Sequence, residues 1–227
     1  MHGQEEVSKA PRIVWTLGHL AILGATAWLL FGGGLATVGG WLGKDWTPGD
    51  PVRRGILVAF GGFLWIRMTM TAFVLLRRKF GWDEAGSVLS ALALYQIGFA
   101  LMGGGSDAPV GVLDWAGVAV YLLGSYLNTG SEYQRKLFKA KPENKGKLYT
   151  QGLFGLARHI NYTGDVLWAA GWAMVTHNKW AGLVPLALFL AFAFMFVPGL
   201  TKYLSGKYGD EFQAWAKKTK KLIPFVF

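Results

Sequence analysis

Five polar or charged side chains crowd into residues 158–165, where an apolar stretch of the chain begins. They are Arg158, His159, Asn161, Tyr162 and Asp165. Guanidinium, imidazole, amide, phenol and carboxylate groups lose favourable hydration when they leave water. At the boundary of a membrane such a cluster must therefore pair internally or bind a polar ligand. Residues 145–165 are the leading candidate for a functional site.

A second group of polar residues precedes this segment and has helical spacing. Asn128, Glu132, Lys136 and Lys139 follow one another at intervals of three or four positions, which places them on one face of a helix. Ammonium and guanidinium groups pair well with phosphate, so a loop rich in Lys and Arg beside such a helix suits an anionic cofactor.

Two simpler interpretations stay open. The helical face is compatible with a solvated surface that carries intrahelical ion pairs, and the basic residues with binding of anionic lipid headgroups. The cofactor is favoured because Asn128, Glu132, Asn161 and Asp165 suit a ribose hydroxyl or a carboxamide, which a lipid patch does not require. No GxGxxG follows a strand, so we expect no Rossmann-type nucleotide site.

Metal chemistry is not expected. The chain has no Cys, and its four His are His2, His19, His159 and His177. None of these lies at the HxxH or HExxH spacing that puts two imidazoles on one helical face, so we predict no metal site.

The composition is typical of an integral membrane protein. Hydrophobic residues make up 52% of the 227 residues and charged residues only 16%, with a mean hydropathy of +0.31. Soluble domains carry about 25% charged residues. We therefore predict an all-α, polytopic membrane fold without a second domain.

About 20 apolar residues cross a bilayer, and on that measure the chain contains six spans. They are residues 13–33, 55–76, 87–104, 110–127, 163–177 and 180–197. Residues 131–141 can continue the fourth span as a helix into water. Pro198 and Gly199 predict a break, after which residues 203–221 are expected to form a polar helix on the cytoplasmic surface.

Lys and Arg are distributed unequally between the two sides of these spans. Eighteen lie in the tails and in alternate loops on one side, and four lie on the other. This asymmetry predicts that both termini are cytoplasmic. It also accounts for the net charge of +10 without nucleic acid, so membrane lipids rather than nucleic acid are the expected partners.

Three segments resemble the membrane-embedded steroid 5-alpha-reductase and sterol reductase superfamily. Its signature segment is similar to RHINYTGD at residues 158–165, with GLF just before it. Residues 123–139, LGSYLNTGSEYQRKLFK, resemble a segment that holds an Asn and an acidic residue four apart in the 5-alpha-reductases. The final KKLIPFVF is similar to their IPF-aromatic terminus. The resemblance covers residues 124–227.

The resemblance implies a cytoplasm-facing NADPH pocket and reduction of a carbon–carbon double bond in a steroid, sterol or related lipid. It divides one membrane domain, residues 1–227, into spans 13–104 on the substrate side and a cofactor-binding half at 110–227. The implied cofactor-binding residues are Asn128, Glu132, Lys136, Lys139, Arg158, His159, Asn161, Tyr162 and Asp165, with Tyr203 and Tyr208 on the C-terminal helix. For the proton donor we consider Tyr162 and Tyr133.

The first half departs from the pattern of the 5-alpha-reductases. They have an adjacent Gln-Glu in an early span, which polarises the steroid ketone, and no such pair occurs in the predicted spans. The nearest polar groups here are His19, Arg67, Asp83, Glu84, Tyr95 and Gln96. We expect His19 to be a hydrogen bonder between helices, Arg67 to face the bundle or snorkel, and the acidic pair to bind the preceding basic residues.

A second resemblance, to isoprenylcysteine carboxyl methyltransferases, gives the alternative hypothesis. Those enzymes share an RHPxY segment, a VP before the last helix and an FGxEY tail, which YGDEF at residues 208–212 resembles. They use S-adenosylmethionine and place paired Glu after the VP, where this chain has residues GLTK at 199–202. A third hypothesis is a membrane protein that binds a lipid or nucleotide without catalysis.

Overall fold

The computed structural model describes residues 9–227, and the regular elements within them are helices; His2 lies outside this range. Four helical stretches are long and apolar enough to cross a membrane: Lys9–Phe31, Pro51–Leu75, Trp82–Gly103 and Lys179–Lys218. The all-α, polytopic class is confirmed. By its contacts the chain divides into two compact units. One comprises the chain up to Val118 with Trp172–Ala181, and the other comprises Ala119–Gly171 and Gly182–Phe227.

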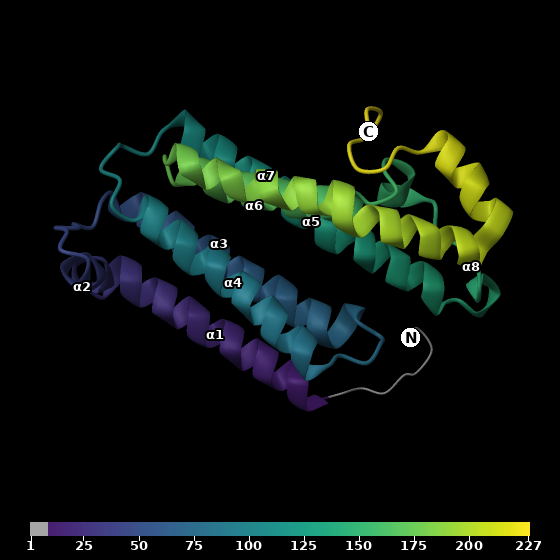
Figure 1. The fold of residues 1–227 in the computed structure, drawn as a ribbon, viewed down its shortest axis with the longest axis horizontal. Coiled ribbons are helices and arrows are strands. Elements are labelled where there is room, and N and C mark those ends of the chain that lie inside the picture. Colours follow the sequence, from purple (N-terminus) through teal and green to yellow (C-terminus); the bar gives the residue numbers. More distant parts are fainter. Residues whose placement is uncertain (1–8) are drawn as a thin grey trace. The chain divides into compact units, whose positions relative to one another are not determined.

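The first unit contains the first three predicted spans as a set of packed helices (Figure 1). They are α1 (Lys9–Phe31), α3 (Pro51–Met70) and α4 (Trp82–Gly103), with a short α2 (Gly34–Trp41) after α1. α3 ends in a wide π-helical turn, η1 (Thr71–Leu75). Apolar length alone located these helices to within a few residues, because each must present a long hydrophobic surface.

Both ends of this unit are held by buried arginines. At one end Arg53 is fully buried, and its Nε and Nη2 donate to the two carboxylate oxygens of Asp114 at 3.2 and 3.3 Å. At the other end Arg12 donates to the carbonyls of Ala72 and Arg78, where the chain leaves η1. Helix ends leave carbonyls without intrahelical partners, and a buried guanidinium satisfies them.

One pair of buried polar side chains inside this unit bridges two helices. His19 of α1 contacts the side-chain amide of Gln96 of α4, and both are buried. Arg67 is buried as well, which agrees with a side chain that faces the bundle. The predicted pairing of the acidic residues is confirmed for Glu84, whose Oε2 accepts from Arg78 Nη1 at 2.7 Å.

Two long helices form the framework of the second unit. α5 (Val112–Ala140) runs unbroken beyond the fourth predicted span, as expected, and α6 (Ile160–Val175) corresponds to the fifth. These two are not among the four stretches that meet the length and hydropathy of a membrane crossing. The segment between them contains two short 3-10 turns, η2 (Pro142–Asn144) and η3 (Gly152–Gly155).

The predicted break at Pro198 is wrong. After a 3-10 turn, η4 (Lys179–Gly182), the chain continues through α7 (Leu183–Ala191), a π-helical stretch η5 (Phe192–Phe196) and α8 (Val197–Lys218). Pro198 lies in the first turn of α8, where a missing N–H costs little, and the wide turn of η5 precedes it. The kink occurs at Gly209 instead, where φ is 48° and ψ is −124°. These angles are readily accessible only to glycine.

α5 and α6 approach each other at two glycines. A Cβ on Gly124 would lie 2.3 Å from the backbone nitrogen of Trp168, and a Cβ on Gly164 would lie 2.4 Å from that of Asn128. These neighbours are backbone atoms, so they cannot rotate away as a side chain could. Only hydrogen fits at both positions, and the crossing fixes the relative register of the two helices that carry the candidate site.

Replacing Gly124 with Ala should therefore force α5 and α6 apart. We expect a loss of stability of about 1–3 kcal/mol or more, typical of overpacking, measured as a lower thermal unfolding midpoint in detergent. Gly55→Ala is the matched control, because a Cβ on that helical glycine meets nothing within 4 Å. It should be neutral or slightly stabilising, since Ala favours the helix by about 1 kcal/mol. Equal midpoints for the two variants would contradict the close crossing.

Candidate functional site

The two groups of polar residues expected from the sequence form one network between α5 and α6. Asn128 Nδ2 donates to Asp165 Oδ1 at 2.9 Å and to the Asn161 carbonyl at 3.2 Å. Asn161 Nδ2 donates to Glu132 Oε1 at 3.2 Å. The close crossing at the two glycines lies beside Asn128, so these short side chains can bridge the helices. All four are half-buried.

Both carboxylates of the network already have donors within the protein. Asp165 Oδ1 also accepts from the indole nitrogen of Trp168 at 2.9 Å, and Glu132 forms an ion pair with Arg135. Hydrogen bonds and a nearby cation stabilise the ionised form of a carboxylate. The network is therefore an ordered set of acceptors, of the kind that orients hydroxyl or amide groups of a ligand.

Arg158 and His159 lie immediately before α6 and are buried, with 9% and 2% of their surface exposed. The Arg158 guanidinium lies over the ring of Phe212, 5.7 Å from its centroid. Arg158 Nε and His159 Nε2 are both buried and have no hydrogen-bond partner among the described residues. An unsatisfied buried polar atom costs about 1–3 kcal/mol. Seven other buried side-chain atoms of the described residues also lack a hydrogen-bond partner, but here two of them lie on adjacent residues, which makes this segment the candidate for binding a polar ligand.

Burial sets the protonation of this pair. It lowers the pKa of His159 to about 4, and the positive charge of Arg158 acts in the same direction. Burial also lowers the pKa of Arg158. His159 is therefore neutral at pH 7 and presents one N–H donor and one acceptor nitrogen rather than a second positive charge.

Tyr162 completes a stack of rings at the start of α6. Its ring lies parallel to that of Phe192, with centroids 4.3 Å apart and an interplanar angle of 2°. On His159 it stacks more loosely, with centroids 5.8 Å apart and an angle of 16°. Three aligned rings hold the phenol in one orientation, although its side chain is only half-buried.

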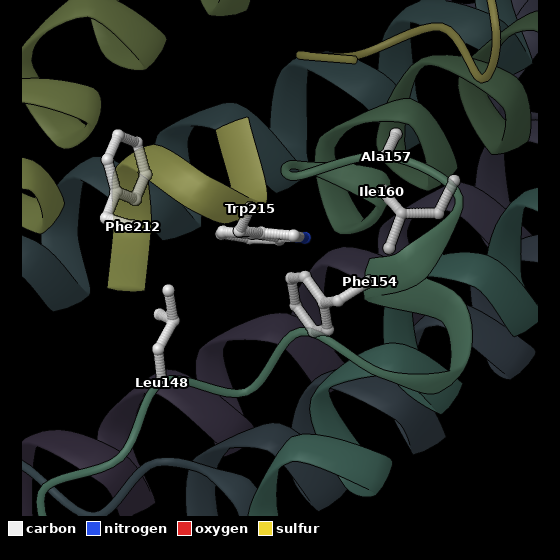
Figure 2. Close-up of a cluster of buried hydrophobic side chains, with 6 residues drawn as sticks. All are labelled: Leu148, Phe154, Ala157, Ile160, Phe212 and Trp215. Carbon is white, nitrogen blue, oxygen red and sulfur yellow. The ribbon is translucent and has the colours of Figure 1, made fainter. Parts of the chain in front are cut away.

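An apolar cluster supports the segment that carries Arg158 and His159. It joins the loop after α5, the start of α6 and the part of α8 beyond Gly209 (Figure 2). Its members are Leu148, Phe154, Ala157, Ile160, Phe212 and Trp215. The kink at Gly209 redirects α8 between Tyr208 and this cluster. Beside it, Lys139 Nζ lies 3.3 Å from the Tyr208 hydroxyl and also donates to the Lys147 carbonyl.

Other predicted residues stand apart from the network. Tyr133 is 41% exposed, and Tyr203 is exposed and accepts from Lys207 Nζ at 3.3 Å. Lys136 is half-buried on α5. Their assigned roles stay predictions.

Sequence analysis missed the residues that hold the site in place. Gly124 and Gly164 carry no polar group, and Phe212 and Leu222 resemble ordinary apolar residues. Thr163 was assigned only as the start of a span. The presence of glycine within these helices was itself a signal of close packing. Glycine destabilises a helix and is used where another backbone must approach closely.

Residues 86–219 match the model of a family described as "Protein of unknown function (DUF1295)", which covers more than half of the chain. The chain belongs to this family. Three relatives extend the comparison. A probable O-methyltransferase, ustE, from Ustilaginoidea virens is 38% identical over 38% of this chain and 31% of its own length. The Delta(14)-sterol reductase erg24 of Schizosaccharomyces pombe is 28% identical over 48% of this chain and 30% of its own.

The third relative is the steroid 5-alpha-reductase DET2 of Arabidopsis thaliana, 31% identical over 49% of this chain and 41% of its own length. This chain thus spans less than half the length of each of these three relatives. The predicted kinship with the superfamily of membrane-embedded steroid and sterol reductases is confirmed. With its apolar helices, the protein is a membrane protein of that superfamily.

The low pKa of His159 predicts a pH-dependent loss of stability. The unfolded chain protonates this ring near pH 6.5, whereas the folded protein keeps it neutral down to about pH 4. Its contribution is therefore complete above about pH 6.5 and is lost as the pH falls toward 4, by up to ~3 kcal/mol. Thermal midpoints from pH 7.5 to 4.5, without added ligand, should fall more steeply for the wild type than for His159→Asn. Parallel curves would show that the ring is not buried as described.

Proposed function

We propose that the protein is an NADPH-dependent membrane reductase that reduces a carbon–carbon double bond in a steroid, sterol or related lipid. The observation that carries the proposal is the polar network of α5 and α6 together with the unpartnered Arg158 Nε and His159 Nε2. The kinship with sterol and steroid reductases supports it. The expected substrate is hydrophobic, as those names and the membrane helices suggest.

The side chains fit the chemistry of such a cofactor. Arg158, with Lys136 and Lys139, would hold its phosphates, because cationic groups bind phosphate oxygens strongly. Asn161 and Asp165 would orient a carboxamide or ribose hydroxyl, while Asn128 and Glu132 hold those two side chains in place. Tyr208, already beside Lys139, would lie at the edge of this region, with Tyr203 nearer the start of α8.

When bound, NADPH supplies a hydride to one carbon of the double bond. The protein must then deliver a proton to the adjacent carbon, so that the alkene gains two hydrogens in total. We assign the proton to Tyr162 rather than Tyr133. The Tyr162 phenol is held between Phe192 and His159, whereas Tyr133 is largely exposed and outside the network.

The second candidate is an S-adenosylmethionine-dependent methyltransferase of a lipid or small hydrophobic substrate. It is favoured by the relative named as an O-methyltransferase, which is 38% identical over 89 residues. Against it, Gly199, Leu200, Thr201 and Lys202 stand where the methyltransferases that the chain resembles have paired Glu. A third candidate binds a nucleotide or lipid in the same region without catalysis.

Ligand binding to the purified protein in detergent separates these candidates. NADPH at about a hundred times its dissociation constant should stabilise the fold by about 2.7 kcal/mol, seen as a higher thermal midpoint. NADH and S-adenosylmethionine are compared in parallel. Stabilisation by S-adenosylmethionine alone would replace the reductase with the methyltransferase. Stabilisation by NADPH without turnover of any enone or sterol would favour the non-catalytic candidate.

Asn161→Ala should weaken NADPH binding by about 10- to 100-fold, because hydrogen bonds that involve charged groups contribute about 1.5–3 kcal/mol. The variant also leaves Glu132 without one donor. Gln213→Ala is the matched control, since this exposed amide on α8 bonds to Ser205 and not to the network. Unchanged affinity for Asn161→Ala in isothermal titration would move the cofactor away from this network.

We also propose that both termini are cytoplasmic, as the distribution of Lys and Arg predicts. The chain has no Cys, so single cysteines report sidedness cleanly. Lys44→Cys should react with a membrane-impermeant maleimide on intact cells, whereas Lys145→Cys should react only after the membrane is opened. The reverse result would invert the topology.

A further inference from the structure

The last nine residues of the chain, 219–227, form what we call the C-terminal strap, which binds the segment that leads into α6. The N–H of Arg158 donates to the Lys220 carbonyl and the N–H of His159 donates to the Lys221 carbonyl, both at 2.9 Å. The hydroxyl of Thr163 donates to the Leu222 carbonyl at 2.5 Å. Three consecutive carbonyls of the strap are therefore occupied by residues of one short segment.

Leu222 anchors the strap. Only 2% of it is exposed, and it packs with Ala193 and Val197, against which Tyr162 and Phe192 also lie. The strap then closes on itself, because the N–H groups of Leu222 and Ile223 both donate to the Phe227 carbonyl, at 2.7 and 2.8 Å. This closed turn and the buried side chain of Leu222 hold the strap in a defined position.

The strap contacts the candidate site through the backbone of Arg158 and His159, which are the two most buried polar residues of that site. Arg158 and His159 precede the first turn of α6, where N–H groups have no intrahelical acceptor. The strap provides those acceptors. The side chains of the same two residues carry the unpartnered Nε and Nε2 atoms that mark the ligand. Any shift of the strap would therefore move these atoms.

We propose that the C-terminal strap positions Arg158 and His159 for the ligand, with Thr163 and Leu222 as the positioning residues. The inference rests on the proposed function in taking NADPH as that ligand. Removing the hydroxyl of Thr163 releases the Leu222 carbonyl, and truncating Leu222 removes the anchor from its apolar pocket. Each change loosens the backbone of Arg158 and His159 without altering any side chain of the polar network.

The test compares Thr163→Val with Thr163→Ser. Valine has nearly the shape of threonine but no hydroxyl, whereas serine keeps the hydroxyl. For Thr163→Val we expect faster amide hydrogen exchange at residues 158–159 and at least a tenfold increase in the Kd for NADPH. Thr163→Ser should restore both to near the wild-type values. Added NADPH should slow exchange in residues 219–227 of the wild type.

Leu222→Ala should act as Thr163→Val does, and its effect must be separated from general destabilisation. Leu57→Ala serves as the control, because Leu57 is fully buried in the first unit. It should lower the thermal midpoint and leave the Kd for NADPH unchanged. An equal loss of affinity in Leu57→Ala and Leu222→Ala would overturn the positioning role, as would wild-type exchange at residues 158–159 in Thr163→Val.

The two proposals fail in different ways. If the wild type binds neither NADPH nor S-adenosylmethionine, the proposed function is wrong. The exchange rates of residues 158–159 in the Thr163 variants still decide the inference, since they need no ligand. If the wild type binds NADPH and Thr163→Val binds it equally well, the proposed function stands and the strap is only a structural terminus.

Discussion

The close crossing of α5 and α6 at Gly124 and Gly164 is the constraint on which the candidate site depends. A side chain at either position would collide with backbone atoms of the facing helix. Asn128 and Asp165 have short side chains and meet at 2.9 Å only because the two backbones are this close. Increasing the separation by the width of a methyl group would break that bond. The chemistry of the site therefore depends first on two residues that have no side chain.

Buried polar groups without a partner support our proposal for where the ligand binds. In the first unit the buried Arg53 donates to Asp114, and Arg12 donates to the carbonyls of Ala72 in η1 and of Arg78 in the loop that follows. Such pairing is what an apolar environment demands of a charge. In the second unit Arg158 and His159 are also buried, and Arg158 Nε and His159 Nε2 have no partner among the described residues, as is true of Arg12 Nε in the first unit. What sets Arg158 and His159 apart is that two such atoms lie on adjacent residues, and this supports our proposal that a polar ligand binds there.

Several helices and one helix face could be predicted from the sequence, because each depends on residues that are close together in the chain. The length of apolar runs located α1, α3 and α4, and helical spacing alone placed Asn128 and Glu132 on one face. What could not be predicted involves residues far apart in the chain. The contact of Thr163 with Leu222 joins positions 59 residues apart, and no periodicity encodes it. The break predicted at Pro198 does not occur, because a π-helical stretch that composition does not reveal precedes the proline and the helix continues through it.

The electrostatics of the site bear on which of the two nucleotide cofactors it suits. NADPH and S-adenosylmethionine both contain ribose, which the amides and carboxylates of the network can bind. They differ in charge, since one carries phosphates and the other a sulfonium cation. The carboxylates of Glu132 and Asp165 are already engaged by Arg135, Asn161 and Asn128. The guanidinium of Arg158 has a free donor and lies in a buried position, where its charge is poorly screened. A buried cation attracts phosphate and repels sulfonium, and this balance of charge supports the NADPH of our proposal.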